Sequence, residues 1–215
     1  LREGIADERI HFVGNVMIDT LHHNLKRAVP AAQTLGRPVP DAGYAVLTLH
    51  RPSNVDHADV LQSLLETVNE VASRIAVVFP LHPRTRAQIE KHGLERLLDN
   101  PNITTLPPLG YLQILGLMQQ ARLVLTDSGG IQEETTALGV PCITLRHNTE
   151  RPITADEGTN TVVGQDREKI LAAFDAVLDG SGKAGRIPEY WDGQASQRIA
   201  AFLHDWLGEQ RREVA

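Results

Sequence analysis

The chain has 215 residues, of which 41% are hydrophobic and 22% charged, ordinary proportions for a globular protein with a core of its own. Its net charge of −6 argues against a duplex nucleic-acid partner, which would need a basic surface. The apolar runs are far shorter than the roughly 20 residues that span a bilayer, and no secretory leader pattern opens the sequence, so we expect no membrane partner. The single cysteine, Cys142, cannot form an internal disulfide, which favours a reducing, cytoplasmic location.

Short apolar segments typical of strands alternate with helical patterns along the whole chain. They are continuous apolar runs, as expected for strands that are covered by helices on both faces. This alternation predicts an α/β fold with a doubly wound, mostly parallel sheet, a Rossmann-like domain. We expect strands at 10–13, 44–49, 75–79, 103–106, 123–126, 142–145 and 161–163, amphipathic helices at 59–73, 170–178 and 199–207, and a linker at 180–185.

A Ser-Gly-Gly turn at 128–130 follows the fifth of these strands and opens a helix that we expect to end near Leu138. The first N–H groups of a helix have no intrahelical partner and lie at the positive end of its dipole. Because Gly129 and Gly130 lack Cβ atoms, a diphosphate can approach those groups, and the Ser128 hydroxyl can add a donor. The motif indicates a phosphate site, while a plain capping turn remains the alternative; neither a dinucleotide fingerprint nor a Walker lysine is present.

Glu134 lies one helical turn beyond this motif. Its carboxylate could accept hydrogen bonds from both hydroxyls of a ribose. The alternative is that the helix dipole favours an acidic residue here whether or not a ligand binds.

Polar residues also follow three other predicted strands. His50 could donate to a phosphate or move a proton, and the planar guanidinium of Arg151 suits a phosphate. Each has an alternative without a ligand. His50 could be a structural hydrogen-bonding residue, and Arg151 could form a salt bridge to Glu150 or be a solvated surface charge. His82 and Arg84 could line the same crevice or another contact surface, and a structural role is the alternative for both. Their convergence on the sheet edge where α/β folds bind ligands favours a common site. Weaker candidates at this edge are Arg51 and Asn54.

The histidines are not spaced with cysteines or carboxylates as a metal site requires. We therefore expect no metal ion, and nothing in the sequence indicates another cofactor.

Six segments together resemble the non-hydrolysing UDP-N-acetylglucosamine 2-epimerases. The resemblance covers nearly the whole chain, and 126–134 followed by 149–152 is its most specific part. It implies that residues 1–215 are the C-terminal, UDP-binding lobe of a two-lobe enzyme with the glycosyltransferase-B arrangement. The full-length enzyme is expected to be a homodimer. The segments are 14–19, 49–54, 79–84, 108–111, 125–134 and 149–152.

The resemblance also implies a reaction and residue roles. UDP-N-acetylglucosamine and UDP-N-acetylmannosamine would interconvert by elimination and re-addition of UDP, supplying a sugar nucleotide for cell-surface polysaccharide. His50 matches a histidine that the family needs for full activity. By the same resemblance, Glu134 would bind the ribose, and the loop at 109–114, which includes Leu109 and Ile114, would lie beside the uracil. The diphosphate would be bound by Ser128, Gly129, Gly130 and Arg151.

Three departures from the family pattern limit these expectations. The family's acid/base carboxylates belong to an N-terminal lobe that no segment here matches, so this chain should bind UDP but turn over little by itself. Pro52 and Ser53 stand where many members have Arg-Glu, so a second, regulatory substrate site is not expected. The segment 188–193 matches the family only in part.

Two other functions fit the same residues. The nucleotide-binding lobe of a glycosyltransferase would share the fold and the diphosphate site. A non-catalytic UDP-sugar-binding module would need no second lobe. His50 and the segment 149–152 favour the epimerase.

Overall fold

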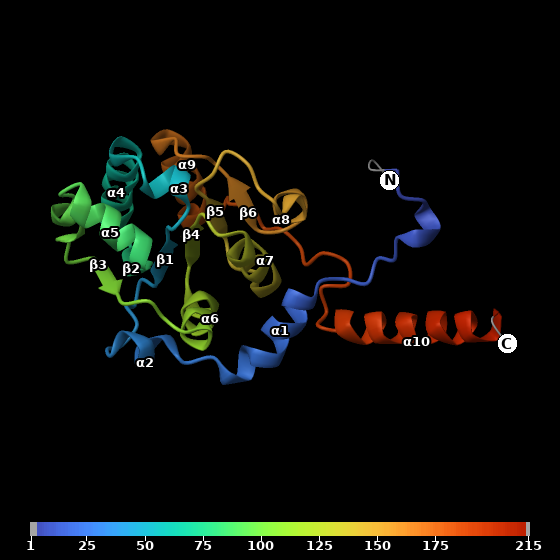
Figure 1. The fold of residues 1–215 in the computed structure, drawn as a ribbon. Helices are drawn as coiled ribbons and strands as arrows, with labels where there is room; N and C mark the ends of the chain where they lie inside the picture. Colours follow the sequence, from blue (N-terminus) through green and yellow to red (C-terminus); the bar gives the residue numbers. More distant parts are fainter. Residues whose placement is uncertain (1–3, 214–215) are drawn as a thin grey trace. The chain divides into compact units, whose positions relative to one another are not determined.

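The computed structural model describes residues 4–213. Within this range, six strands form one parallel sheet in the order β3-β2-β1-β4-β5-β6 (Figure 1). This is the Rossmann strand order, which reverses beside the first strand and leaves a crevice at the carboxyl ends. The predicted doubly wound α/β fold is confirmed. The strands are β1 (Tyr44–Thr48), β2 (Ala76–Pro80), β3 (Ile103–Leu106), β4 (Leu123–Thr126), β5 (Cys142–Thr144) and β6 (Asn160–Val162).

Helices follow each strand, and those expected from apolar spacing are present as α4, α9 and α10. The helix after the Ser-Gly-Gly turn is α7, which ends where Gly139 adopts a left-handed conformation with φ of 70°. The helices are α1 (Val16–Asn24), α2 (Ala31–Leu35), α3 (Pro52–Val55), α4 (Ala58–Ala72), α5 (Pro83–Lys91), α6 (Tyr111–Gln120), α7 (Gly129–Leu138), α8 (Pro152–Asp156), α9 (Arg167–Asp179) and α10 (Ala195–Glu213), with 3-10 turns η1 (Asp7–Arg9), η2 (Leu25–Arg27) and η3 (Glu95–Leu98).

Both faces of the sheet are covered, because successive side chains of a strand point to opposite sides. Leu47 and Leu125, paired across β1 and β4, belong to the apolar core that the sheet forms with α4 and α9. Tyr44 points the other way and donates from its hydroxyl to the carbonyl of Leu117 in α6, at 2.6 Å. Figure 1 shows α6 and α7 on this second side of the sheet. Burial on both faces explains the continuous apolar strands in the sequence.

Contacts divide the chain into two compact units. One consists of 24–187 and contains the sheet with all the strand-end motifs. The other combines 1–23 with 188–215 and contains α1 and α10. Inside this second unit the Asp19 carboxylate accepts the N–H groups of Ala195 and Ser196, at 3.0 and 2.6 Å, and so caps α10. The assignment of all 215 residues to one UDP-binding lobe stays a prediction.

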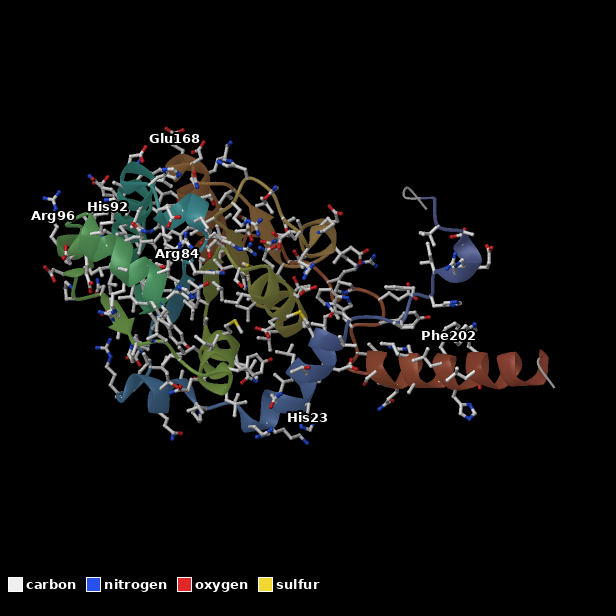
Figure 2. All side chains as sticks on the ribbon, viewed as in Figure 1. His23, Arg84, His92, Arg96, Glu168 and Phe202 are labelled. Carbon is white, nitrogen blue, oxygen red and sulfur yellow. The ribbon has the colours of Figure 1, made fainter. Side chains whose placement is uncertain are left out.

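The strand predicted at 10–13 is wrong. In the part of the chain that the structure describes, this segment pairs with no strand, and Ile10 and Phe12 are 47% and 58% exposed. The neighbouring His11 ring instead lies 3.8 Å from the Phe202 ring of α10, whose side chain is labelled in Figure 2. An apolar segment becomes a strand only where a neighbouring strand can satisfy its backbone, and the described residues of this unit form none.

The linker predicted at 180–185 is a loop after α9, but it is tied to the sheet-containing unit. Gly182 donates to the carbonyl of Ala176 at 2.6 Å, and Arg186 donates to that of Glu157 at 2.7 Å. The boundary between the units falls slightly later, between Ile187 and Pro188. None of the helices formed by residues 4–213 combines the length and apolar character needed to cross a bilayer.

Candidate functional site

A cleft of about 350 Å³ opens at the carboxyl ends of β1, β2 and β4. This is the sheet edge at which the sequence predicted a ligand site. The strand order brings these three ends together, because β1 lies between β2 and β4. Five predicted site residues line the cleft: His50, His82, Leu109, Ile114 and Ser128.

The helix start at α7 is open toward a ligand. Ser128 is the N-cap residue, yet its side chain does not cap the helix. Its backbone N–H donates to the Thr126 hydroxyl at 3.0 Å. Among residues 4–213, the N–H groups of Gly129 and Gly130 form no hydrogen bond with an acceptor. A purely structural capping turn would use the Ser128 hydroxyl, so this geometry favours a binding role for both the hydroxyl and the free N–H groups.

Asp127 is a functional candidate to which sequence reasoning assigned no role. Its fully buried carboxylate accepts the backbone N–H groups of His50 and Arg51, each at 2.9 Å, and lies 2.8 Å from Nδ1 of His50. Burial by itself would raise the pKa of Asp127, but the His50 and backbone hydrogen bonds outweigh it and lower the pKa. The available signal was an aspartate directly after a buried strand, beside the strand that leads to His50.

The weaker candidates Arg51 and Asn54 brace the loop after β1. Asn54 is buried and donates to Asp127 at 3.2 Å and to the Leu145 carbonyl at 2.8 Å. The Arg51 guanidinium lies 3.4 Å from Glu150. Neither side chain lines the cleft, so the structure gives both a supporting position.

His82 and Arg84 diverge although they are two residues apart. His82 caps α5, because its Nδ1 accepts the N–H of Arg84 at 3.2 Å, and its ring lies 5.5 Å from that of His50. Arg84, whose side chain is labelled in Figure 2, does not line the cleft. It forms a two-pronged ion pair with Asp56, just beyond α3. The hydrogen bonds from Arg84 lower the pKa of the partly buried Asp56. The structure therefore brings His82, but not Arg84, to the site.

Arg151 contacts both α7 and its neighbour Glu150, to whose backbone carbonyl its Nη1 donates at 3.3 Å. Its Nε lies 3.0 Å from Oε1 of the buried Glu133, whereas the sequence had suggested Glu150 as the structural partner. The backbone N–H of Arg151 donates to the Thr149 hydroxyl at 2.9 Å, and that hydroxyl donates to Gln132 of α7 at 2.5 Å. These contacts hold the segment that carries Arg151 against the helix whose open end lies at the cleft.

Glu134 is buried in α7 and forms a hydrogen bond with the Tyr111 hydroxyl. Burial raises the pKa of Glu134, the Tyr111 bond lowers it in part, and the like charge of Glu133 raises it further, so the net shift is upward. This bond links Glu134 to the first residue of α6.

The expected loop at 109–114 is a loop only in its first part. Residues from Tyr111 onward form the first turn of α6, and the Gly110 N–H donates to the side chain of Gln113 at 3.0 Å. This side-chain bond satisfies a backbone donor before the helix begins and so favours an early start. Ile114 therefore reaches the cleft from a helix and Leu109 from a loop.

Over residues 4–213 there is no cluster of three or more histidine, cysteine or acidic side chains arranged to hold a metal ion. The donors gathered at the cleft are instead N–H, hydroxyl and imidazole groups beside apolar side chains. This combination suits an organic anion with an apolar part.

Residues 1–204 match the family model described as UDP-N-acetylglucosamine 2-epimerase. The chain belongs to this family. A UDP-N-acetylglucosamine 2-epimerase from Methanococcus maripaludis is 40% identical over 202 residues, covering 87% of this chain and 55% of that protein. A UDP-2,3-diacetamido-2,3-dideoxy-D-glucuronate 2-epimerase from Pseudomonas aeruginosa is 39% identical, covering 89% of this chain and 51% of the other.

Solved structures of epimerases share the fold. The UDP-N-acetylglucosamine 2-epimerase of Methanocaldococcus jannaschii, in complex with UDP-GlcNAc and UDP, superposes with a TM-score of 0.80 at 38% identity. The superposition covers 94% of this chain and 57% of that one. The chain thus spans somewhat more than half the length of the epimerases that it matches.

Proposed function

We propose that this chain is the UDP-binding part of a UDP-N-acetylglucosamine 2-epimerase, which interconverts UDP-N-acetylglucosamine and UDP-N-acetylmannosamine. The observation that carries the proposal is the open start of α7 at a cleft. There, Ser128 lines the cleft without capping the helix, and the N–H groups of Gly129 and Gly130 have no acceptor among the described residues. A helix start of this kind binds a diphosphate.

The other candidate residues suit the remaining parts of UDP. Leu109 and Ile114 offer apolar surface for the uracil on the other wall of the cleft. Glu134 would exchange its bond with Tyr111 for the ribose hydroxyls. Arg151 would add a charged donor near the phosphates, since its segment is anchored to α7.

The reaction requires a good leaving group. In the forward direction, C2 loses its proton, the C1–O bond breaks, UDP leaves with the bonding electron pair, and a C1–C2 double bond forms. The proton then returns to the opposite face of C2, and UDP adds back at C1. Because C2–H is only weakly acidic, negative charge on departing UDP must be stabilised, and the α7 N–H groups with Arg151 supply fixed dipoles and charge for this.

His50 lines the cleft and serves as the proton-exchanging or hydrogen-bonding group at the departing diphosphate. Confinement of the reactive sugar beside UDP makes the return step effectively unimolecular. The groups that act on C2 belong to the remainder of the full-length enzyme, so this chain by itself is expected to bind UDP with little turnover. The product would feed cell-surface polysaccharide synthesis.

Two experiments test this function. The full-length enzyme is incubated with UDP-N-acetylglucosamine in deuterium oxide, and we expect deuterium at C2 together with the N-acetylmannosamine form. Absence of both products contradicts the epimerase assignment. Calorimetric titration of this chain with UDP tests whether the chain binds UDP. Heat indistinguishable from that of a buffer titration would contradict UDP binding by this chain.

A second substrate has specific support, because the relative named for UDP-2,3-diacetamido-2,3-dideoxy-D-glucuronate is nearly as similar as the one named for UDP-N-acetylglucosamine, at 39% and 40% identity. The two sugars carry different groups at C3 and C5 and the same UDP. Supplying both to the full-length enzyme and comparing kcat/KM distinguishes them.

The proposal also includes a cytoplasmic homodimer. The buried free thiol of Cys142 is compatible with a reducing compartment. The dimer rests on the family resemblance, and analytical ultracentrifugation of the full-length enzyme tests it.

A further inference from the structure

The carboxylate of Asp127 lies directly beside the His50 ring, at the inner wall of the cleft. Its Oδ1 is 2.8 Å from Nδ1 of His50, while Oδ2 accepts the N–H groups of His50 and Arg51, each at 2.9 Å, and the amide of Asn54 at 3.2 Å. Asp127 is fully buried, whereas about a third of the His50 side chain is exposed. Oδ1 also accepts the His50 N–H, at the longer distance of 3.2 Å, so Oδ1 is the oxygen that faces the ring while three donors face Oδ2.

These contacts decide which nitrogen of the ring carries a proton. The hydrogen bonds around Asp127 outweigh its burial and lower its pKa, so the carboxylate is ionised at neutral pH and only accepts hydrogen bonds. A neutral imidazole beside such an oxygen places its proton on Nδ1. Among residues 4–213, no group forms a hydrogen bond with Nε2 of His50. The remaining lone pair of the ring is thus left for a ligand.

We propose that Asp127 is the positioning residue of His50. It holds the ring in the Nδ1–H tautomer and leaves Nε2 as the atom that exchanges a proton or hydrogen bond with a ligand in the cleft. When Nε2 takes up a proton, the adjacent carboxylate stabilises the imidazolium. The consequence for turnover rests on the proposed function, while the tautomer itself does not.

The two-sided arrangement makes Asp127→Asn an informative variant. Three donors face Oδ2, so the amide oxygen of asparagine takes that position. Its NH₂ group then occupies the position of Oδ1 and donates to Nδ1 of His50. The three hydrogen bonds to the Oδ2 position are kept, and only the longer contact of the His50 N–H with Oδ1 is lost. The ring is forced into the Nε2–H tautomer, whose Nε2 cannot accept a hydrogen bond from a ligand in the cleft.

Nuclear magnetic resonance measures this tautomer directly. The chain is labelled with ¹⁵N-histidine, and the His50 signals among the nine histidines are assigned by their loss in His50→Gln. Spectra are recorded at about pH 8.5, two units above the ordinary histidine pKa. We expect protonated Nδ1 and unprotonated Nε2 in the wild-type chain, and the reverse in Asp127→Asn.

Asp56→Asn is the matched control, because Asp56 pairs with Arg84 and does not contact His50. It should keep the wild-type tautomer. An Nε2–H signal in the wild-type chain overturns the proposal, and so does an unchanged His50 signal in folded Asp127→Asn. If that variant does not fold, the wild-type spectrum alone decides.

Turnover gives a second readout in the full-length enzyme. Asp127→Asn should lower kcat on the order of 100-fold, as for the loss of a positioned acid/base group, with KM changing less than about threefold. Activity equal to that of Asp56→Asn would overturn the positioning role. A wild-type enzyme without epimerase activity but with the Nδ1–H tautomer would contradict the proposed function and leave the positioning of His50 intact.

Discussion

The guanidinium of Arg151 is held by Glu133, with Nε of the arginine 3.0 Å from Oε1 of the carboxylate. Glu133 is almost fully buried in α7, whereas 42% of the Arg151 side chain is exposed. The pair thus fixes the inner edge of the guanidinium to the helix that carries the open N-terminus. Nη1 also donates to the Glu150 carbonyl at 3.3 Å, and the exposed part of the side chain is available to an anion.

Arg151→Ala is expected to weaken UDP binding to this chain by about 1–3 kcal/mol, the range for a charge-assisted hydrogen bond. Titration calorimetry measures the change. Arg84→Ala is the control, because Arg84 is paired with Asp56 outside the cleft and should leave the affinity unchanged. Equal affinities for both variants and the wild type would exclude Arg151 from the site.

Ser128→Ala separates binding from helix capping. The Ser128 side chain does not cap α7, so the variant should keep its resistance to urea. Its UDP affinity should fall by about 1–3 kcal/mol if the hydroxyl donates to a phosphate. The opposite result, a loss of about 1 kcal/mol in stability with unchanged affinity, would support the capping role.

Glu134→Gln should change stability with a defined dependence on pH. The folded-state pKa of Glu134 is raised, mainly by burial, so its stabilising contribution is complete below the ordinary value of 4.5 and is lost as pH rises through the folded value. Glutamine carries no charge, so its contribution does not change with pH. As the pH rises through this range, the variant should therefore gain stability relative to the wild type. Urea unfolding over a pH series checks this, and a difference that does not vary with pH would contradict it.

The same variant should bind UDP more weakly, by about 1.5–3 kcal/mol, because a carboxylate accepts stronger hydrogen bonds from ribose hydroxyls than an amide does. Titration calorimetry with UDP measures this loss. Pyrophosphate, which has no ribose, is the control ligand. A loss that is equal for both ligands would mean that Glu134 does not contact the ribose.

Gly116→Ala should destabilise the chain severely. A Cβ at this position in α6 would lie 1.7 Å from the backbone carbonyl oxygen of Val29, which cannot move aside as a flexible side chain could. We expect overpacking to lower the free energy of unfolding by roughly 1–3 kcal/mol or more, although alanine has the better helix propensity. Gly208→Ala in α10 meets no atom within 4 Å and should be neutral or stabilising in the same urea experiment.

Much of the architecture followed from patterns that are local in the sequence. The six strands lie within one residue of their predicted ends, and the helix after the Ser-Gly-Gly turn ends at Leu138 as expected. Apolar periodicity and the turn and capping preferences of glycine act over a few residues, so they can be interpreted without the fold. The segment 10–13 had the same apolar pattern but no neighbouring strand, and this requirement is not local.

The sequence by itself determined that several polar motifs follow strand ends and that one of them opens a helix with two glycines. The tertiary structure decided which of their side chains meet: Asp127 contacts His50 although 77 residues separate them, Arg151 pairs with Glu133, and Arg84 turns away to Asp56. Such pairs depend on strand order, because β1 lies beside β4 only after a long crossover has been completed. Contacts between residues so far apart in the sequence form only when the whole sheet packs, and no short stretch of sequence encodes them.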